Sequence, residues 1–419
     1  MGQHHQILII GGGTGGITVA ARLLRKDSKL DIGIIEPSSK HYYQPAWTLV
    51  GAGTYDLKDT IRDEKDYIPK GATWIQDKVV SADPDKNSVT TEKKGTITYD
   101  YLVVAAGIQY NWDAIPGLRE ALGKHGVTSN YEKDMTTYTW ELLQKTKNGN
   151  AIFTQPATPI KCGGAPQKIM YLAEDYWRKH GVRQNINVIF ATPGTVIFGV
   201  KKFADTLNKI VKNRNIFTRF YHKLVAIDPD KQEAVYQFTK PEEKPVLTEE
   251  DKKLGIRLEG DDKFIIPFTM LHTPPPQSAP DFIKNSKLAR PEDPYGWVDV
   301  DKFTLQHVRY PNVYSLGDAA GTPNAKTGAA VRKQAPVLVE NLLDTMKKHS
   351  LEGNPTYDGY GSCPLVTRYG RMVLAEFDYD NKPTPSFPIN TAKERYSMWI
   401  LKKYFLPWLY WNRMLKGKA

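Results

Sequence analysis

Short apolar runs that end in glycine or in an acidic residue recur along the chain. The first is ILII at 7–10 and the second lies within DIGIIE at 31–36; others lie within YDYLVVAAG at 99–107 and VYSLGDAAG at 313–321. Continuous apolar runs of this length are typical of strands that are buried on both faces, as in parallel sheets. The pattern therefore predicts an α/β fold.

The turn after the first run has the spacing Gly11-x-Gly13-x-x-Gly16. Gly11 permits a tight turn, Gly13 lets the backbone approach a pyrophosphate, and Gly16 lets the next helix pack closely on the strand. That helix, expected at 17–27, would direct its N-terminal N–H groups at the phosphates. Glu36 lies twenty residues beyond Gly16, where a carboxylate can accept hydrogen bonds from ribose hydroxyls. This order of features predicts a dinucleotide site.

Two later runs resemble segments of flavoproteins that have two dinucleotide-binding domains. The run at 99–107 ends in Ala-x-Gly, and the run at 313–321 contains Gly-Asp at its turn. By this resemblance, Asp318 binds the ribityl-phosphate side of FAD, and Ala105 and Gly107 lie near the cofactor.

Relatives in that superfamily commonly carry a second GxGxxG for NAD(P)H in the middle of the chain. The matching segment here, at 185–207, keeps a strand but lacks the glycines. A turn without them is less able to bring backbone N–H groups against a pyrophosphate. We therefore expect the second domain to persist without binding a nicotinamide.

The chain has two cysteines, Cys162 and Cys363. Their wide separation argues against a zinc ribbon, and their small number argues against a disulfide-stapled secreted domain. Cys162 stands just before a predicted helix, and Lys161 and Lys168 flank it; both features favour a thiolate. Two unrelated buried cysteines are the alternative. Next to a flavin, a functional pair predicts electron transfer from sulfur.

Over nearly its full length the chain resembles the sulfide:quinone oxidoreductases, of the type that includes the mitochondrial enzymes. The matching strings include HYYQPAWTLVGAG, GNAIFTQPATPIKCGGAPQKIMYLAEDYWRK, FGVKKFAD, YDGYGSCPLVTRYGRMVLAEFDY and KERYSM. The resemblance implies that Cys162 and Cys363 flank the flavin and cycle through a disulfide or trisulfide. It puts the persulfide on Cys363 and the flavin-reacting thiolate on Cys162. Some relatives tether FAD through a third cysteine, so the FAD here is expected to be non-covalent.

The same resemblance implies a wider set of site residues and partners. The cofactor-binding set is Gly11, Gly13, Gly16, Glu36, Gln44, Pro45, Ala105, Gly107, Asp318 and Lys326. The quinone set is Lys326, Phe377 and Lys402. Hydrogen sulfide is the expected electron donor and a membrane quinone the acceptor. The sulfane sulfur would pass to sulfite, a small thiol or another sulfide, and no metal is expected.

The C-terminal segment 393–419 interleaves aromatic and basic residues around Pro407. Its apolar runs are too short for a spanning helix. A kinked amphipathic helix that enters one leaflet fits this composition, and the net charge of +11 favours an anionic lipid surface. The alternative is a helix that packs on its own domain or on a partner. We expect a peripheral, monotopic protein of a bacterial cytoplasmic membrane or, if a transit peptide has been removed, of the mitochondrial inner membrane. The basic charges are scattered without a nucleic-acid-binding motif, so no nucleic acid is expected.

The fold expected from these features has two Rossmann-like domains, the second vestigial for NAD, and a C-terminal membrane-associating helical segment. The FAD domain is discontinuous, comprising 1–112 and 295–345, with the second domain at 113–294 and the quinone and membrane region at 346–419. The charged stretch 240–263 is expected to form a surface hairpin or loop.

Three other functions share parts of this pattern. A type II NADH:quinone dehydrogenase has the fold, FAD and a membrane tail, but it requires a working nicotinamide site. The flavin subunit of a flavocytochrome c sulfide dehydrogenase shares the cysteines, but it predicts a cytochrome partner and export. A flavin-binding scaffold with an inert disulfide would lack sulfide chemistry.

Overall fold

The N-terminal apolar runs form the centre of a seven-stranded sheet in the computed structural model, which describes residues 3–323, 326–348 and 351–419. The strand order is β5-β2-β1-β8-β7-β6. Strand β20 pairs with the end of β8 on the edge away from β1, beyond the part of β8 that pairs with β7. Strands β5, β2, β1, β8 and β20 run parallel. Their bounds, with those of β6 and β7, are β1 Gln3–Ile10, β2 Ile32–Ile35, β5 Ala72–Ile75, β6 Val79–Asp83, β7 Ser88–Thr91, β8 Gly95–Val104 and β20 Val313–Ser315.

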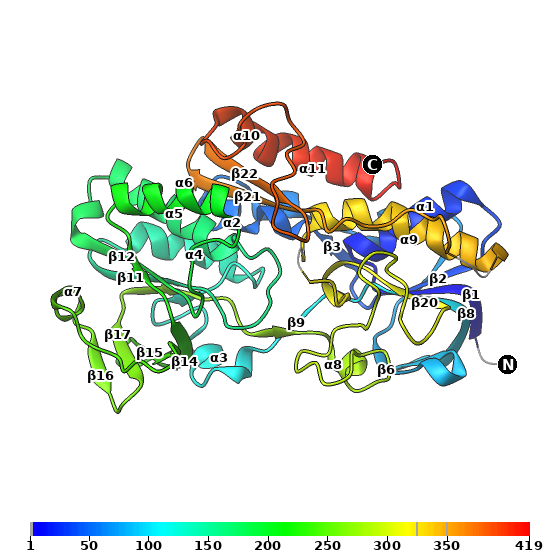
Figure 1. Cartoon of the computed structure of the whole chain (residues 1–419), viewed down its shortest axis with the longest axis horizontal. Helices are drawn as coiled ribbons and strands as arrows, with labels where there is room; N and C mark the ends of the chain where they lie inside the picture. The colour runs from blue at the N-terminus through cyan, green and yellow to red at the C-terminus, as the bar shows by residue number, and fades with distance from the viewer. Residues whose placement is uncertain (1–2, 324–325, 349–350) are drawn as a thin grey trace.

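A second, five-stranded parallel sheet has the order β10-β18-β11-β12-β13. Figure 1 shows the two sheets side by side, each covered by helices. The bounds are β10 Val127–Thr128, β11 Gly149–Thr154, β12 Ile186–Ala191, β13 Phe217–Arg219 and β18 Met270–His272. Two Rossmann-like sheets with helices between the strands confirm the predicted fold class.

The strand order corrects the prediction about the second dinucleotide turn. In the first sheet β1 lies between β2 and β8, and in the second sheet β11 lies between β12 and β18. The equivalent of the glycine turn after β1 is therefore residues 155–164, which join β11 to helix α5, and not the segment 185–207. The latter holds β12 and helix α6. Residues 155–164 read QPATPIKCGG and also lack GxGxxG. The fingerprint is therefore absent from the equivalent turn, as expected, although that turn lies one strand earlier than predicted.

The remaining strands form smaller antiparallel units. A four-stranded sheet has the order β14-β15-β17-β16, and three strand pairs are β3–β4, β9–β19 and β21–β22. The charged stretch 240–263 contains a short helix, α7, and then enters the hairpin β16–β17, so the predicted surface hairpin is partly correct. The bounds are β3 Lys40–Tyr42, β4 Ile61–Asp63, β9 Gln109–Tyr110, β14 His222–Asp228, β15 Glu233–Phe238, β16 Arg257–Glu259, β17 Lys263–Pro267, β19 Gln277–Ser278, β21 Gly361–Arg368 and β22 Arg371–Phe377.

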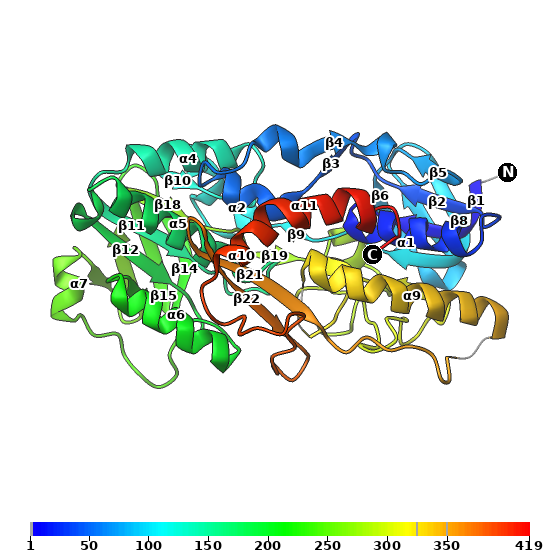
Figure 2. The same cartoon turned by 90° about the horizontal axis from the view of Figure 1, so that it is seen from above.

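The helices cover the two parallel sheets and join them along one side. Figures 1 and 2 show the C-terminal segment, in red, running from the second domain across to α1 and α9 of the first. The bounds are α1 Thr14–Lys26, α2 Trp47–Val50, α3 Leu118–Ala121, α4 Met135–Lys145, α5 Ala165–Lys179, α6 Lys201–Asn213, α7 Glu249–Lys253, α8 Asp281–Lys284, α9 Gly328–Lys348, α10 Tyr396–Ile400 and α11 Leu406–Leu409.

The C-terminal segment 396–414 is helical, as predicted, but it alternates between two helix types. Turns of π-helix, Leu401–Phe405 and Tyr410–Met414, follow α10 and α11. Pro407, which was expected to kink the helix, lies near the start of α11 directly after a π-helical turn, and the backbone is helical on both sides of it. Because a proline has no N–H, it leaves one carbonyl of the preceding turn without a backbone partner. Among the described helices, none has the length and apolar content that a membrane crossing requires.

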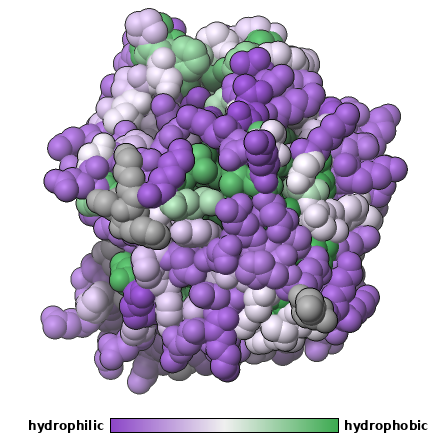
Figure 3. All heavy atoms as spheres, turned by 90° about the vertical axis from the view of Figure 1, so that its right-hand side faces the viewer, coloured by the Kyte–Doolittle hydropathy of each residue, from purple (hydrophilic) through white to green (hydrophobic). Residues whose placement is uncertain are grey.

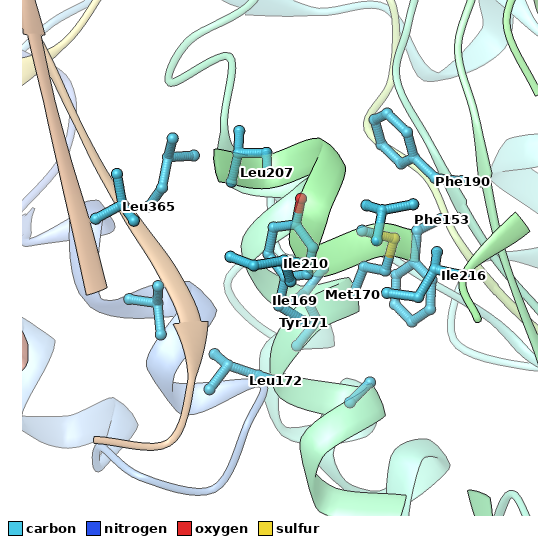
Figure 4. Packing of buried hydrophobic residues seen from close by; sticks show 14 of the residues in the cluster. Phe153, Ile169, Met170, Tyr171, Leu172, Phe190, Leu207, Ile210, Ile216 and Leu365 are labelled. Carbon is cyan, nitrogen blue, oxygen red and sulfur yellow. The ribbon is translucent and has the colours of Figure 1, made fainter. Parts of the chain in front are cut away.

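A large apolar core fixes the hairpin β21–β22 on the second domain. Leu365 of β21 belongs to the same apolar cluster as Ile169 and Leu172 of α5, while Phe153 of β11 lies beside Met170 on the sheet side of that helix. Figure 4 shows this cluster, with the hairpin on one side of α5 and the sheet on the other. The opposite end of the molecule, which carries the first sheet, presents mainly hydrophilic residues (Figure 3). Packing on α5 and pairing with β22 therefore hold β21 in place.

Candidate active site

The turn between β1 and α1 has the geometry of a dinucleotide-binding turn. Gly11 adopts φ +102°, and a side chain there would collide with the carbonyl of Ala105. A side chain at Gly16 would collide with the carbonyl of Gly11. Gly13, by contrast, faces open space, with no described protein atom within 4 Å of where its Cβ would be. No side chain caps the N-terminus of α1, so its N–H groups are left for a ligand.

Glu36 follows β2 and lies beside this turn. Its Oε2 accepts a hydrogen bond from Gly12 N–H (2.8 Å), and its Oε1 accepts one from Ser38 N–H (2.7 Å). Burial raises the pKa of the Glu36 carboxyl. An open glycine turn, an uncapped helix N-terminus and a fixed carboxylate fit the pyrophosphate and ribose of a dinucleotide. The residues predicted for FAD therefore fit that group at its nucleotide end.

The expected flavin end of the site gathers around Lys161. Its Nζ donates a hydrogen bond to Gln44 Oε1 and lies 3.8 Å from Asp318 Oδ2. Asp318 lies in the short turn Gly317–Ala319 that follows β20, and Gln44 opens the turn Gln44–Ala46. Gly107, just beyond β8, adopts φ +74° and also faces open space among the described residues. Residues far apart in the sequence thus converge at the carboxyl ends of the first sheet, where α/β folds bind ligands.

Lys326 is buried in the same region. Its Nζ donates hydrogen bonds to the carbonyls of Asp318 (2.6 Å) and Ala320 (3.1 Å), and it lies 3.5 Å from the ring centre of Trp297. Burial lowers the pKa of Lys326 to about 8. Its own carbonyl accepts a hydrogen bond from Cys162 N–H (3.0 Å). Lys326 therefore links the Asp318 turn to the loop that carries the first cysteine.

Cys162 adopts a backbone conformation that side-chain-bearing residues rarely use. Its φ is +52°, in the left-handed region, and neighbours hold the loop on both sides. Tyr131 Oη donates to the Lys161 carbonyl (2.9 Å), and Gln277 Oε1 accepts from Lys161 N–H (3.0 Å). The Cys162 carbonyl accepts from Ala165 N–H (2.8 Å) at the start of α5. Strain of this kind persists only where the surroundings fix it, and it is common at reactive sites.

The two cysteines lie in contact, although they are far apart in the sequence. Their thiols share a hydrogen bond, and a side chain at Gly164 would collide with Cys363 Sγ. Cys363 is buried on β21, whereas Cys162 is partly exposed; both are free thiols in this structure. Lys168, one turn into α5, donates to Cys162 Sγ at 2.9 Å.

The electrostatic surroundings distinguish the two sulfur atoms. The hydrogen bond from Cys363, together with the charge of Lys168, holds the pKa of the Cys162 thiol well below its usual value. The hydrogen bond to Cys162 and burial raise the pKa of the Cys363 thiol well above it. The arrangement therefore favours a thiolate on Cys162 and a protonated or sulfur-bonded Cys363.

Of the predicted quinone residues, Lys402 lies close to the cysteines. It is buried in the C-terminal segment, its Nζ donates to the Pro45 carbonyl (2.7 Å), and burial lowers its pKa to about 7. The charges of Lys168 and both sulfur atoms also act on it. Phe377 ends β22, pairs with Gly361 across the hairpin and packs edge-on against Phe198 at 5.9 Å. Phe377 therefore lies at the open end of the hairpin, away from the turn that joins β21 to β22, and on the side of the second domain.

Several residues around the site carried no signal of their own in the sequence. Tyr131, Gln277 and Trp297 hold the cysteine loop and Lys326, yet each lies in an ordinary stretch without a motif. Only the spatial order of the strands brings them together. Lys168 was noted as a nearby cation, but its direct contact with sulfur was not foreseen.

Comparisons with known proteins agree with this geometry. A family model described as pyridine nucleotide-disulphide oxidoreductase matches residues 5–146. The chain is 46% identical over 415 residues to the mitochondrial sulfide:quinone oxidoreductase of Mus musculus, covering 99% of this chain and 87% of that protein. It is 47% identical to the mitochondrial sulfide:quinone oxidoreductase of Dictyostelium discoideum, covering 99% and 86%.

A solved structure shares the fold. The crystal structure of the sulfide:quinone oxidoreductase from the hyperthermophilic bacterium Aquifex aeolicus matches with a TM-score of 0.79 and 20% identity, covering 99% of this chain and 92% of that one. At this identity the likeness concerns the fold alone.

Proposed function

Because this chain belongs to the sulfide:quinone oxidoreductase family, we propose that it oxidises hydrogen sulfide and passes two electrons to a quinone. Its cofactor is FAD, in keeping with the family and with the glycine turn and Glu36. The observation that carries the proposal is the buried contact between Cys162 and Cys363, with Lys168 bound to the first sulfur. Two neighbouring thiols are the pair from which a disulfide could form.

The proposed chemistry begins with the oxidised pair. Hydrosulfide attacks the sulfur of Cys363, the Cys162–Cys363 bond breaks, and a new sulfur–sulfur bond joins the incoming sulfur to Cys363. Cys162 leaves as a thiolate, which the ammonium group of Lys168 stabilises at 2.9 Å. Its depressed pKa makes Cys162 the better leaving group, so the persulfide is expected on Cys363.

FAD, when bound, supplies the two-electron acceptor that links the thiolate to the quinone. Gly11, Gly13 and Glu36 would hold its nucleotide end, and Gln44, Asp318 and Lys326 would lie around its flavin end. Lys402 reaches the Gln44–Ala46 turn from the C-terminal segment, through its hydrogen bond to the Pro45 carbonyl. We propose that this binding is non-covalent, because the chain has no cysteine beyond the two already described.

The sulfane sulfur must then leave Cys363 so that the pair can be oxidised again. A nucleophilic acceptor, such as sulfite, a small thiol or a second hydrosulfide, takes the outer sulfur and leaves the Cys363 thiolate. Loss of two electrons from the two thiolates then restores the disulfide, and FAD, when bound, would accept these electrons. In sum, one sulfide and one acceptor give one persulfidated acceptor and one reduced quinone.

The quinone is proposed to arrive from a membrane surface beside the C-terminal segment. Tyr396, Ile400, Tyr404 and Trp408 recur every fourth residue on one face and are 37–58% exposed, while Lys402 and Tyr410 face inward. An exposed aromatic and apolar face of this kind suits the interface of one leaflet. We therefore propose a peripheral protein, and the mitochondrial names of the relatives favour the inner mitochondrial membrane. We also propose that the boundaries between the domains lie near residues 112, 294 and 345.

Steady-state quinone reduction tests the proposal. With sulfide, sulfite and a soluble quinone, the wild type should reduce the quinone and form thiosulfate in equal amounts. Cys162→Ser and Cys363→Ser should each lower the rate by several orders of magnitude, since the thiolate and the disulfide are both lost. Ser362→Ala, beside Cys363 on β21, is the matched control and should retain activity. Retained activity in both cysteine variants would refute the proposed chemistry.

A further inference from the structure

A surface cavity lies between residues 55–62 and the C-terminal segment. Its volume is about 520 Å³. These residues are separate from the cofactor, cysteine and quinone residues described above. The cavity has charged groups on one wall and aromatic rings on both. The first wall carries Tyr55, Lys58, Asp59 and Arg62, and the second carries Trp408, Trp411 and Asn412.

Arg62, on β4, is an exposed cation whose position is fixed by aromatic groups. Its guanidinium carbon lies 4.4 Å from the ring centre of Trp411, which is itself only 3% exposed. One N–H donates to Tyr67 Oη (2.6 Å), and this is the only hydrogen bond of the guanidinium within the described part of the chain. A guanidinium has five N–H donors in a planar fork, which suits the paired oxygens of a phosphate. Arg62 thus keeps most of its donors for a ligand.

The other two charged groups of this wall differ in their surroundings. Lys58 Nζ lies 3.1 Å from Asp56 Oδ2, so the charge of Lys58 is largely neutralised. Asp59 is exposed, and its carboxylate forms neither an ion pair nor a hydrogen bond with any residue that the structure describes. The cavity therefore offers one cation, Arg62, and one anion, Asp59, that have no ion-pair partner among the described residues.

The cavity lies at the end of the exposed face that we propose enters one leaflet. Tyr396, Ile400, Tyr404 and Trp408 form this face at intervals of four residues, and Trp408 also lines the cavity. Asn412, at the next interval, lines the cavity as well and is polar. Tryptophan side chains gather at the level of the lipid headgroups, where the apolar interior of a membrane gives way to water. The change from apolar to polar residues therefore puts the cavity at headgroup level.

We propose that this cavity binds the headgroup of a zwitterionic phospholipid that carries a primary ammonium group. The phosphate accepts hydrogen bonds from Arg62, and the ammonium donates to Asp59. A headgroup with a net negative charge fits less well, because Asp59 repels it. A choline group fits less well too, because it has no N–H to donate to the carboxylate. The inference rests on the proposed function only in taking the C-terminal segment to lie at a membrane surface.

A short-chain lipid below its micelle-forming concentration tests the cavity without a membrane. Dihexanoyl phosphatidylethanolamine is titrated into the holoenzyme, and broadening of its phosphorus NMR signal gives the dissociation constant. Arg62→Gln should raise this constant about tenfold, because hydrogen bonds between charged groups are lost. Asp59→Asn should raise it about 2- to 5-fold, as expected for one exposed ion pair. Lys65→Gln and Asp66→Asn remove the same charges from exposed positions outside the cavity, and both should bind the lipid as the wild type does.

Other ligands separate recognition of the whole headgroup from binding of any anion. Dihexanoyl phosphatidylglycerol has the phosphate without the ammonium, so it should bind the wild type more weakly. Asp59→Asn should remove this preference, whereas Arg62→Gln should weaken the binding of both lipids by the same factor. If phosphatidylglycerol or inorganic phosphate bound the wild type as tightly as phosphatidylethanolamine, the proposed recognition of the ammonium would be refuted, and the cavity would be an anion site only.

Vesicles extend the test to a membrane. Flotation of the holoenzyme is compared between pure phosphatidylcholine vesicles and vesicles of equimolar phosphatidylcholine and phosphatidylethanolamine. The wild type should bind the mixed vesicles more tightly, and Arg62→Gln should lose this difference. Reduction of a soluble quinone by sulfide should keep its wild-type rate in Arg62→Gln, because Arg62 lies outside the reacting groups.

Two results would overturn the inference and leave the proposed function intact. One is wild-type affinity for dihexanoyl phosphatidylethanolamine in Arg62→Gln, and the other is equal binding of the wild type to the two kinds of vesicle. If the wild type bound neither kind of vesicle, the proposed membrane contact would fail instead, and the short-chain lipid would still decide the role of the cavity. If Arg62→Gln did not fold, Asp59→Asn would decide the matter, since it must weaken phosphatidylethanolamine binding and spare phosphatidylglycerol binding.

Discussion

The turns after β1 and after β11 occupy the same place in two similar sheets, yet we propose that they stabilise different anions. The first, residues 11–13, is short and made of glycine, and it presents the N-terminus of α1 to open space. The second, residues 155–164, is longer and carries Cys162 just before α5. In both cases we propose that the start of a helix stabilises a negative group: a pyrophosphate at α1, and at α5 a Cys162 thiolate, whose sulfur accepts a hydrogen bond from Lys168 of that helix. Both sheets thus place the start of a helix at the turn, and we propose that the residues of the turn determine which anion that helix stabilises.

The difference also gives a physical reason to propose that this flavoprotein lacks a nicotinamide site. The second turn is filled by Lys161, Cys162 and the residues that hold them, including Tyr131 and Gln277. Cys363, on a hairpin that packs on α5, completes this filling. We therefore propose that the second turn holds the sulfur chemistry in the place where a second dinucleotide would otherwise bind.

The largest expected effect is on the first turn. Gly13→Ala adds a methyl group where the structure has open space, so the apoprotein should melt at the wild-type temperature. FAD affinity should nevertheless fall about 10- to 100-fold, because the methyl group meets the pyrophosphate. Fluorescence titration and calorimetry of the apoprotein check the two parts. Unchanged FAD affinity would show that this turn does not hold the pyrophosphate.

The second turn offers the complementary substitution. Gly164→Ala directs a methyl group at Cys363 Sγ and the side chain of Leu365. The sulfide-dependent rate should fall about tenfold or more through displacement of the sulfur, while the FAD content stays at the wild-type level. Gly163→Ala, whose added methyl group would meet no described atom within 4 Å, is the control and should leave both unchanged. Loss of FAD from Gly164→Ala would contradict the division of labour between the turns.

A smaller effect is expected from the cation beside Cys162. Lys168→Met removes the ammonium group that lies 2.9 Å from Cys162 Sγ. The thiol pKa of Cys162 should rise, shifting the midpoint of its alkylation by iodoacetamide upward by about one pH unit or more. Mass spectrometry identifies the labelled cysteine at each pH. Lys179→Met, at the far end of α5, should leave the midpoint in place.

The smallest effect concerns Lys402 and the stability of the fold. Burial lowers the pKa of Lys402 to about 7, from 10.5 for a free side chain. Between these values the unfolded chain binds more protons than the folded one, so the free energy of unfolding rises with pH across this window and falls as the pH drops toward 7. The contribution reaches at most about 1.4 kcal/mol per pH unit.

Urea unfolding between pH 7 and 9.5 measures this slope. Lys402→Met should show a smaller increase in stability with pH than the wild type, whereas Lys403→Met, at the neighbouring position, should retain the wild-type slope. Equal slopes in the wild type and in Lys402→Met would show that Lys402 keeps its charge in the folded protein.

The comparison of the turns also shows what the sequence could predict. The turn after β1 was predicted correctly because its glycines, its helix and Glu36 are close in the sequence and act locally. The second turn was placed one strand too late, because strand order is a property of the assembled sheet and not of any single run. The same limit hid the hydrogen bonds that join Tyr410 to Thr14 and to His41, because these residues are far apart in the sequence and carry no motif.

The cysteine pair was predicted in part from the sequence. Their number, their glycine-rich and basic surroundings and the family resemblance predicted a pair, and the structure places them in contact. The sequence did not predict that Cys162 adopts φ +52° or that Lys168 reaches its sulfur. Both depend on the loop being held from several sides by residues of other elements.

The most direct test of the exchange of roles between the two turns is a pair of anaerobic cuvettes that hold the purified flavoprotein. Sulfide is added to one and NADH to the other, and the flavin absorbance near 450 nm is followed. Our account predicts rapid bleaching by sulfide, recovery when a quinone is added, and no bleaching by NADH. Rapid bleaching by NADH would contradict it, because the turn that carries Cys162 would then have kept a nicotinamide site.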